Sequence, residues 1–144
     1  MLNTILRLLY HQGYTPDVHI QHEANTTTVQ IFQKMPENAE LRFCFRIGEE
    51  VGSVSYALLY PYEGRLTQTA RMELYRTVRS SYEAFHTAED GYYDGYIALC
   101  GKAIAAHVTP LYVERVVEES LAAIPHLKAI SEASAQAQGN IPLW

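Results

Sequence analysis

Histidine is the residue type in this 144-residue chain that most invites metal chemistry. Six are present, namely His11, His19, His22, His86, His107 and His126. Only His19 and His22 lie close together in the sequence, and three positions apart on an extended segment they face opposite sides. No HExxH or HxH pattern and no carboxylate-rich cluster accompanies them, although these are the usual arrangements of a zinc site. The sequence therefore predicts histidines without a metal, and no other cofactor.

Nucleophilic and phosphate chemistry also lack their usual patterns. No GxSxG turn presents a serine, and the two cysteines, Cys44 and Cys100, fall in apolar, strand-like runs where we expect them to be buried. No GxGxxG or GxxxxGK[ST] loop is present to hold a nucleotide phosphate. The acidic pairs Glu49-Glu50 and Glu118-Glu119 fall on a predicted turn and a solvated helix face. We therefore expect a protein that is not an enzyme.

Tyrosine is unusually frequent, with 11 Tyr against 4 Phe and one Trp. It offers a large contact area at a small entropic cost and keeps a polar tip, so it suits protein interfaces. Adjacent Tyr92 and Tyr93 cannot both face one core, so at least one points outward. We predict a protein-binding role for four tyrosines: Tyr62, Tyr92, Tyr93 and Tyr96. Two alternatives stay open. The tyrosines could lie at the solvent-exposed edge of the core, or they could line a ligand pocket.

Arginines are concentrated in one segment, where four of the chain's 11 basic residues fall within fifteen positions: Arg65, Arg71, Arg76 and Arg79. Such a patch could bind an acidic protein or a phosphate. Arg76 and Arg79 point away from the apolar stripe of the predicted helix, so we add them to the protein-binding set. The interspersed Glu73 and Glu83 leave a second interpretation, an ordinary solvated helix face.

The first half of the chain predicts one helix followed by strands. Apolar residues recur at spacings of three and four over Leu2 to Gln12, which is typical of a helix. A short strand over Asp17 to His22 follows, and then an antiparallel meander from Thr26 to Tyr60. Within it, apolar and polar residues alternate over Leu41–Ile47 and Val54–Tyr60, as in strands that bury one face.

The second half begins with an amphipathic helix from Leu66 to Tyr82, whose apolar residues recur every four positions. A hairpin is predicted between Phe85 and Leu99, with Asp90-Gly91 in its turn. The strand that follows, Ile97 to Ala106, is apolar on both faces apart from one lysine, so we expect both faces to be covered.

The C-terminal part predicts two helices. Thr109-Pro110 combines a capping hydroxyl with a proline at the first helical position, so a helix starts there. Pro125 is expected to end or kink it. A weaker helix is predicted over His126 to Gln138, and residues 139–144 are expected to form a flexible tail of the single domain 1–144.

Composition limits the class of protein. With 48% hydrophobic and 19% charged residues, the chain is typical of one soluble globular domain. A net charge of −5 argues against direct binding of nucleic acid, which depends on neutralising phosphates. Two cysteines without a CxxC pair predict neither a disulfide framework nor a zinc site. We find no signal peptide and no apolar run of membrane-spanning length, so we expect a cytoplasmic protein that does not contact membranes.

Several of these segments together support a family resemblance. They are the opening helix ending at Gly13-Tyr14, the two alternating strands, the helix from Leu66 into Tyr82-Glu83-Ala84-Phe85, and the helix start Val108-Thr109-Pro110-Leu111. This order of helix, meander, amphipathic helix, hairpin and helix resembles the type III secretion chaperone-like fold, and more particularly the YbjN family. The resemblance implies an α+β fold and a homodimer that works by binding client proteins, with an association to regulation and stress responses.

The expected function is therefore a non-catalytic, homodimeric protein-binding adaptor or chaperone-like regulator. An exposed strand edge could accept an extended client peptide. Two other classes stay open: a small-ligand-binding or enzymatic α+β domain with a tyrosine-lined pocket, and a nucleic-acid-associated regulator that uses the arginine helix.

Overall fold

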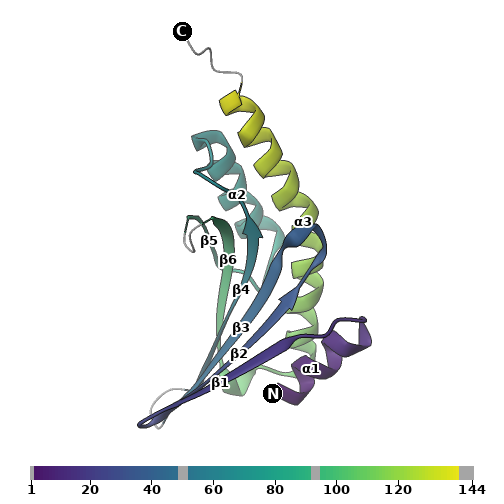
Figure 1. The fold of residues 1–144 in the computed structure, drawn as a ribbon, viewed down its shortest axis with the longest axis vertical. Coiled ribbons are helices and arrows are strands. Elements are labelled where there is room, and N and C mark those ends of the chain that lie inside the picture. Colours follow the sequence, from purple (N-terminus) through teal and green to yellow (C-terminus); the bar gives the residue numbers. More distant parts are fainter. Residues whose placement is uncertain (1, 49–51, 92–94, 140–144) are drawn as a thin grey trace.

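The computed structural model describes residues 2–48, 52–91 and 95–139, and its fold is α+β, as predicted. Within these ranges, three α-helices pack on one face of a single antiparallel sheet (Figure 1). The helices are α1 (Leu2–His11), α2 (Gln68–Ser81) and α3 (Pro110–Gly139).

The sheet has six strands in the order β1-β2-β3-β4-β6-β5. The strands are β1 (Asp17–Glu23), β2 (Thr26–Lys34), β3 (Glu40–Gly48), β4 (Gly52–Pro61), β5 (Thr87–Asp90) and β6 (Tyr96–Ile104). Strands β2, β3 and β4 form the predicted meander, β1 is the predicted short strand before it, and β5 and β6 form the predicted hairpin. Strand β6 lies between β4 and β5, so β1 and β5 are the two edges of the sheet (Figure 1).

The core follows from the alternation along the central strands. Leu41, Phe43 and Phe45 of β3 are at most 2% exposed and face the helices. The residues between them face the other side, because successive side chains of a strand point to opposite faces. On β4, Tyr56 pairs with Phe43 across the strands and continues the same buried face. One layer of helices on one face of the sheet therefore makes the main core.

Strand β6 is covered on both faces only over its first half. Ile97 and Leu99 join the main core, whereas Ala98 packs on the opposite face with Ala57 and Leu59. From Lys102 onward the strand is half-buried or exposed, and Ile104 is 59% exposed. The prediction of two covered faces is therefore wrong for the second half, which extends beyond the short strand β5.

The two predicted C-terminal helices are one continuous helix, α3, which runs through Pro125. Proline in a helix interior lacks the N–H that would bond the carbonyl four residues earlier, here that of Leu121. Pro125 is exposed, so water can reach this part of the helix. Ile124 and Leu127 on either side are buried in the same core. Packing of both halves therefore holds the helix together across the proline.

Gly139 is the last residue of α3, and the rest of the predicted tail lies outside the described residues. Among the described helices, none is both long and apolar enough to span a membrane.

Candidate functional site

The outward side of α2 brings together two of the predicted protein-binding residues. Arg76 and Arg79 are exposed, and beside them Met72 and Tyr75 are 59% and 48% exposed. Positions separated by three and four residues lie on the same side of a helix. These four side chains therefore form one line along α2, which we call the α2 stripe. Aromatic residues, methionine and arginine are the types enriched at the cores of protein interfaces.

A groove of about 390 Å³ lies at the C-terminal end of the α2 stripe. It is lined by Tyr75, Val78, Arg79, His86 and Thr87, so α2 forms one wall and the start of β5 the other. The stripe therefore offers a recess with an apolar wall and an arginine at its side.

The arginines of the predicted cluster that lie on α2 differ in whether they form an ion pair. Arg71 is 3.2 Å from a carboxylate oxygen of Asp90, which joins the start of α2 to β5. In the part of the chain that the structure describes, neither Arg76 nor Arg79 forms an ion pair. Arg71 thus has a structural partner, whereas the two stripe arginines present their charges to solvent.

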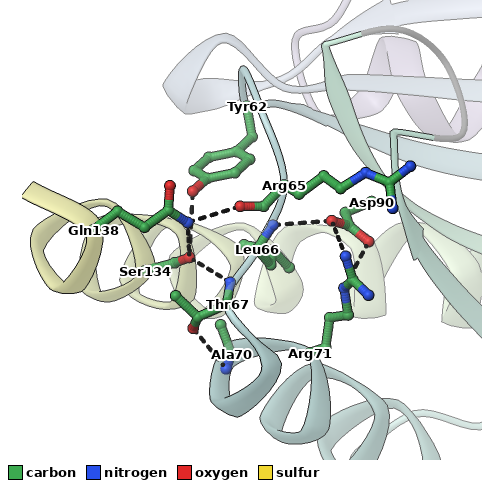
Figure 2. A network of polar contacts seen from close by, with 9 residues as sticks. All are labelled: Tyr62, Arg65, Leu66, Thr67, Ala70, Arg71, Asp90, Ser134 and Gln138. Atoms are coloured by element: carbon green, nitrogen blue, oxygen red, sulfur yellow. Dashed lines mark hydrogen bonds and ion pairs between the residues drawn. The ribbon is translucent and has the colours of Figure 1, made fainter. Parts of the chain in front are cut away.

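Tyr62 belongs to a polar network that ties the segment after β4 to α3 (Figure 2). Its hydroxyl donates to Ser134 Oγ at 3.3 Å, and the Thr67 N–H donates to the same oxygen at 3.0 Å. Gln138 Nε2 donates to the carbonyl oxygen of Arg65 at 2.8 Å. The structure therefore places Tyr62 in an internal contact with α3, away from the α2 stripe.

The other predicted tyrosines are not brought to the α2 stripe either. Tyr96, at the start of β6, is half-buried and packs against Ala57, Leu59 and Ala98 on the sheet face opposite the helices. Tyr92 and Tyr93 lie outside the described residues.

Sequence reasoning missed Met72 and Tyr75 as members of the exposed surface. The signal was present in their spacing, because Met72 precedes Arg76 by four positions and Tyr75 precedes Arg79 by four. Both residues also lie off the apolar stripe of Leu74 and Val78, which is a second signal of their exposure.

A second groove, of about 330 Å³, lies along the uncovered face of the sheet, and its lining includes both cysteines. Cys44 and Cys100 are half-buried there rather than fully buried, because the alternation places them on the face without helices. Burial raises the pKa of the Cys100 thiol, and a nearby glutamate acts in the same direction. The thiol is therefore protonated at neutral pH and a poor nucleophile.

Arg42 also lines this groove, and its guanidinium has partners within the chain. The Arg42 guanidinium lies 4.7 Å from the centre of the Phe32 ring and 3.5 Å from a carboxylate oxygen of Glu40. Its charge is therefore partly balanced without any ligand.

Tyr56 forms a buried hydrogen-bonded link between three elements. Its hydroxyl donates to the carbonyl oxygen of Ala84, and the Tyr112 hydroxyl oxygen of α3 lies 2.5 Å away. Since Tyr56 has one hydroxyl proton, Tyr112 donates to Tyr56. Burial is the main cause that raises the pKa of Tyr56, and the contact with Tyr112 adds to it. Tyr56 is therefore a core residue whose hydroxyl finds its partners inside the chain.

The histidines do not assemble a metal site in the described ranges, where no group of three or more His, Cys, Asp or Glu side chains is placed to hold an ion. His19 packs edge-on against Phe32, with ring centres 5.2 Å apart. His22 places Nδ1 3.2 Å from the Thr27 hydroxyl.

Strand β1 is a second exposed feature. Of the described strands only β2 pairs with it, so its outer edge is free. All seven residues are exposed, including Val18 at 38% and Ile20 at 54%. An open edge of this kind is a template for pairing with another strand.

Comparisons with protein-family models, with curated proteins and with solved structures find no significant match to this chain. The resemblance to the YbjN family therefore stays a prediction.

Proposed function

We propose that this chain is a non-catalytic, homodimeric protein-binding adaptor or chaperone-like regulator of the cytoplasm, which binds client proteins through the α2 stripe. The observation that carries the proposal is the stripe itself, in which exposed Met72 and Tyr75 lie on the same side of α2 as two arginines that have no ion pair in the described ranges. The resemblance to the YbjN family adds an involvement in stress responses to the same proposal.

The charges of the stripe define the chemistry of the client. Arg76 and Arg79 can each form paired hydrogen bonds with a carboxylate, which a lysine cannot do in the same geometry. Tyr75 and Val78 give the adjoining groove an apolar wall. The client segment that fits is therefore acidic, with an apolar side chain that enters the groove.

Protein binding is favoured over nucleophilic catalysis because two side chains that could act as nucleophiles are held in their protonated forms. The pKa of Tyr56 and that of Cys100 are both raised, so neither side chain ionises readily at neutral pH. Binding of nucleic acid is less favoured, because the stripe contributes two arginines and the whole chain has a net charge of −5.

The experiment compares capture of proteins by immobilised wild-type chain with capture by an Arg76→Glu/Arg79→Glu variant. The matched control is Arg7→Glu/Arg46→Glu, which makes the same charge change at exposed positions of α1 and β3. Extracts of the source organism are treated with nuclease before binding, and circular dichroism checks that each variant is folded.

We expect wild type and control to retain the same proteins, and the stripe variant to retain at least about tenfold less of them, as for loss of central interface contacts. Equal retention by the two variants would contradict the proposal. Retention by the wild type only in parallel extracts that are not treated with nuclease would instead assign the stripe to nucleic acid.

A further inference from the structure

We infer that a second copy of this chain pairs antiparallel with the free edge of β1, so that two sheets join across a two-fold axis. The inference rests on the proposed function in one respect, since it names the interface of the proposed homodimer. It concerns a part of the molecule that is separate from the α2 stripe.

The edge of β1 lacks the lysine, proline and bulges that normally prevent pairing, and its two acidic residues stand at its ends. Its sequence, Asp-Val-His-Ile-Gln-His-Glu, contains no lysine, proline or glycine, and its register with β2 is regular along its whole length. Exposed edges are usually blocked by lysine or proline, by bulges or by a very short strand. Strand β5, at the opposite edge, is only four residues long. The longer, unblocked edge is therefore the one suited to a partner strand.

The hairpin between β1 and β2 determines which backbone groups of β1 point outward. A two-residue turn, Ala24–Asn25, joins Glu23 to Thr26, and this closing pair is a hydrogen-bonded one in such hairpins. Hydrogen bonding alternates along an antiparallel pair. The free N–H and C=O groups of β1 therefore belong to Val18, Ile20 and His22.

The side chains then select one register. With His19 on the two-fold axis, Val18 of each copy lies opposite Ile20 of the other, and both exposed β-branched residues gain an apolar neighbour. With Ile20 on the axis, Asp17 would lie opposite Glu23 twice, which brings like charges together. With Gln21 on the axis, Val18 would face the turn residue Ala24 and lose a strand partner. The structure thus favours the register centred on His19.

In this register His19 meets the same residue of the second copy in a non-hydrogen-bonded pair. The two Cα atoms of such a pair are about 4.5 Å apart, which lies within the range that a disulfide spans. A cysteine at this position therefore reports the register directly.

The experiment introduces His19→Cys into a chain that also carries Cys44→Ser and Cys100→Ser, and follows disulfide formation under mild oxidation. Gln21→Cys in the same background is the control, because it lies on the same strand face but four positions from its own copy in this register. We expect His19→Cys to give a covalent dimer and Gln21→Cys to remain uncrosslinked.

Light scattering provides a second measurement that does not depend on cysteine chemistry. Wild type is expected at twice the chain mass of 16.3 kDa, and Ile20→Lys at the mass of the monomer. Met72→Lys, a matched change on the α2 stripe, is expected to stay dimeric. If Ile20→Lys does not fold, the crosslinking result still decides whether two copies pair through β1.

The outcomes separate this inference from the proposed function. A wild-type dimer that does not crosslink through residue 19 and survives Ile20→Lys would overturn the inference and leave the proposed homodimer standing. A monomeric wild type would overturn both the inference and the proposed dimer, whereas client capture through Arg76 and Arg79 would be unaffected. Loss of client binding, but not of the dimer, in Ile20→Lys would assign the edge to an extended client and overturn the inference.

Discussion

The hydroxyl of Tyr56 makes its hydrogen bonds inside the chain, in a residue that is 4% exposed. Its partners come from two other elements, the segment before β5 and the helix α3. Its ring makes edge-on contacts with Phe85 and Tyr112, at centre distances of 5.9 and 6.2 Å. Because an unpaired buried hydroxyl costs about 1–3 kcal/mol, these contacts hold the three elements in one arrangement.

Gly101 provides the space that this arrangement needs. A Cβ at this position would lie 2.2 Å from the carbonyl oxygen of Ala84 and 2.3 Å from a ring carbon of Tyr56. Gly101→Ala should therefore lower the free energy of unfolding by about 1–3 kcal/mol, as overpacking does. Urea unfolding tests this against Gly139→Ala, where a Cβ meets no atom within 4 Å. Equal effects of the two substitutions would contradict the prediction.

Tyr56 also predicts a dependence of stability on pH. Because burial raises the pKa of its hydroxyl in the folded chain, the unfolded chain loses this proton first, near the ordinary pKa of about 10. The stabilisation is therefore fully present below about pH 10 and is lost as the pH rises further, by roughly 1.4 kcal/mol per pH unit.

Urea unfolding of wild type and Tyr56→Phe from about pH 9 to about pH 11 measures this contribution, since the phenylalanine has no proton to lose. The slope should be shallower in Tyr56→Phe. Tyr10→Phe, at an exposed position of α1, is the control and should keep the slope of the wild type. Identical slopes in all three proteins would show that Tyr56 is not the group responsible.

At the scale of elements, α3 holds the connection between α2 and β5 through Glu119. The two carboxylate oxygens accept the N–H groups of Glu83 and Ala84, each at 2.8 Å. This segment also supplies the carbonyl that Tyr56 binds. One side chain of the helix therefore fixes the position at which the chain leaves α2.

Glu119→Ala should lower the free energy of unfolding by about 1–3 kcal/mol, because both N–H groups lose their acceptor. Hydrogen exchange at the Glu83 and Ala84 amides should become faster. The adjacent, exposed Glu118 gives a matched control, and Glu118→Ala is expected to stay within about 0.5 kcal/mol of wild type. Unchanged exchange in Glu119→Ala would show that the two hydrogen bonds to Glu119 are not formed in solution.

Replacing Pro125 is expected to raise the free energy of unfolding, whereas the substitutions of Gly101 and Glu119 lower it. Pro125 lies inside α3 at an exposed position, where it lacks the hydrogen bond that another residue would donate. Pro125→Ala should therefore raise the free energy of unfolding, by about 1–3 kcal/mol. Thermal unfolding measures the change, and a lower midpoint than that of wild type would show that the proline contributes to the packing of α3.

At the scale of the whole molecule, the two proposed interaction surfaces are well separated. Strand β1 is one edge of the sheet, and α2 contacts β5 at the other edge (Figure 1). A second copy at β1 therefore leaves the α2 stripe accessible, and one dimer presents two stripes. Client binding and dimer formation are expected to be independent of each other.

Dimer formation predicts that thermal stability depends on protein concentration. When only the folded chain associates, the unfolding midpoint rises with concentration, and a range from about 1 µM to about 100 µM suffices to detect it. We expect this rise in wild type and its absence in Ile20→Lys. Differential scanning calorimetry checks both, and a midpoint independent of concentration in wild type would contradict the predicted dimer.

Local patterns were enough to predict most of the architecture of this chain. The alternation over Leu41–Ile47 determined which residues of β3 face the core, and the spacing of Leu74 and Val78 determined the buried side of α2. These features depend only on the geometry of a strand or a helix, which neighbouring residues specify by themselves. The exposure of Arg76 and Arg79 follows from the same reasoning.

Contacts between residues far apart in the sequence decided the rest. Pro125 is a local signal to stop a helix, and burial of Ile124 and Leu127 in a shared core outweighs it. The sequence predicts Tyr62 as a protein-binding residue. In the structure its hydroxyl donates to Ser134, which lies 72 positions away. The sequence alone determined the elements and their apolar faces, because those are set by near neighbours. Only the tertiary structure decided which polar groups are engaged inside the chain and which stay exposed, because that depends on partners that no local pattern identifies.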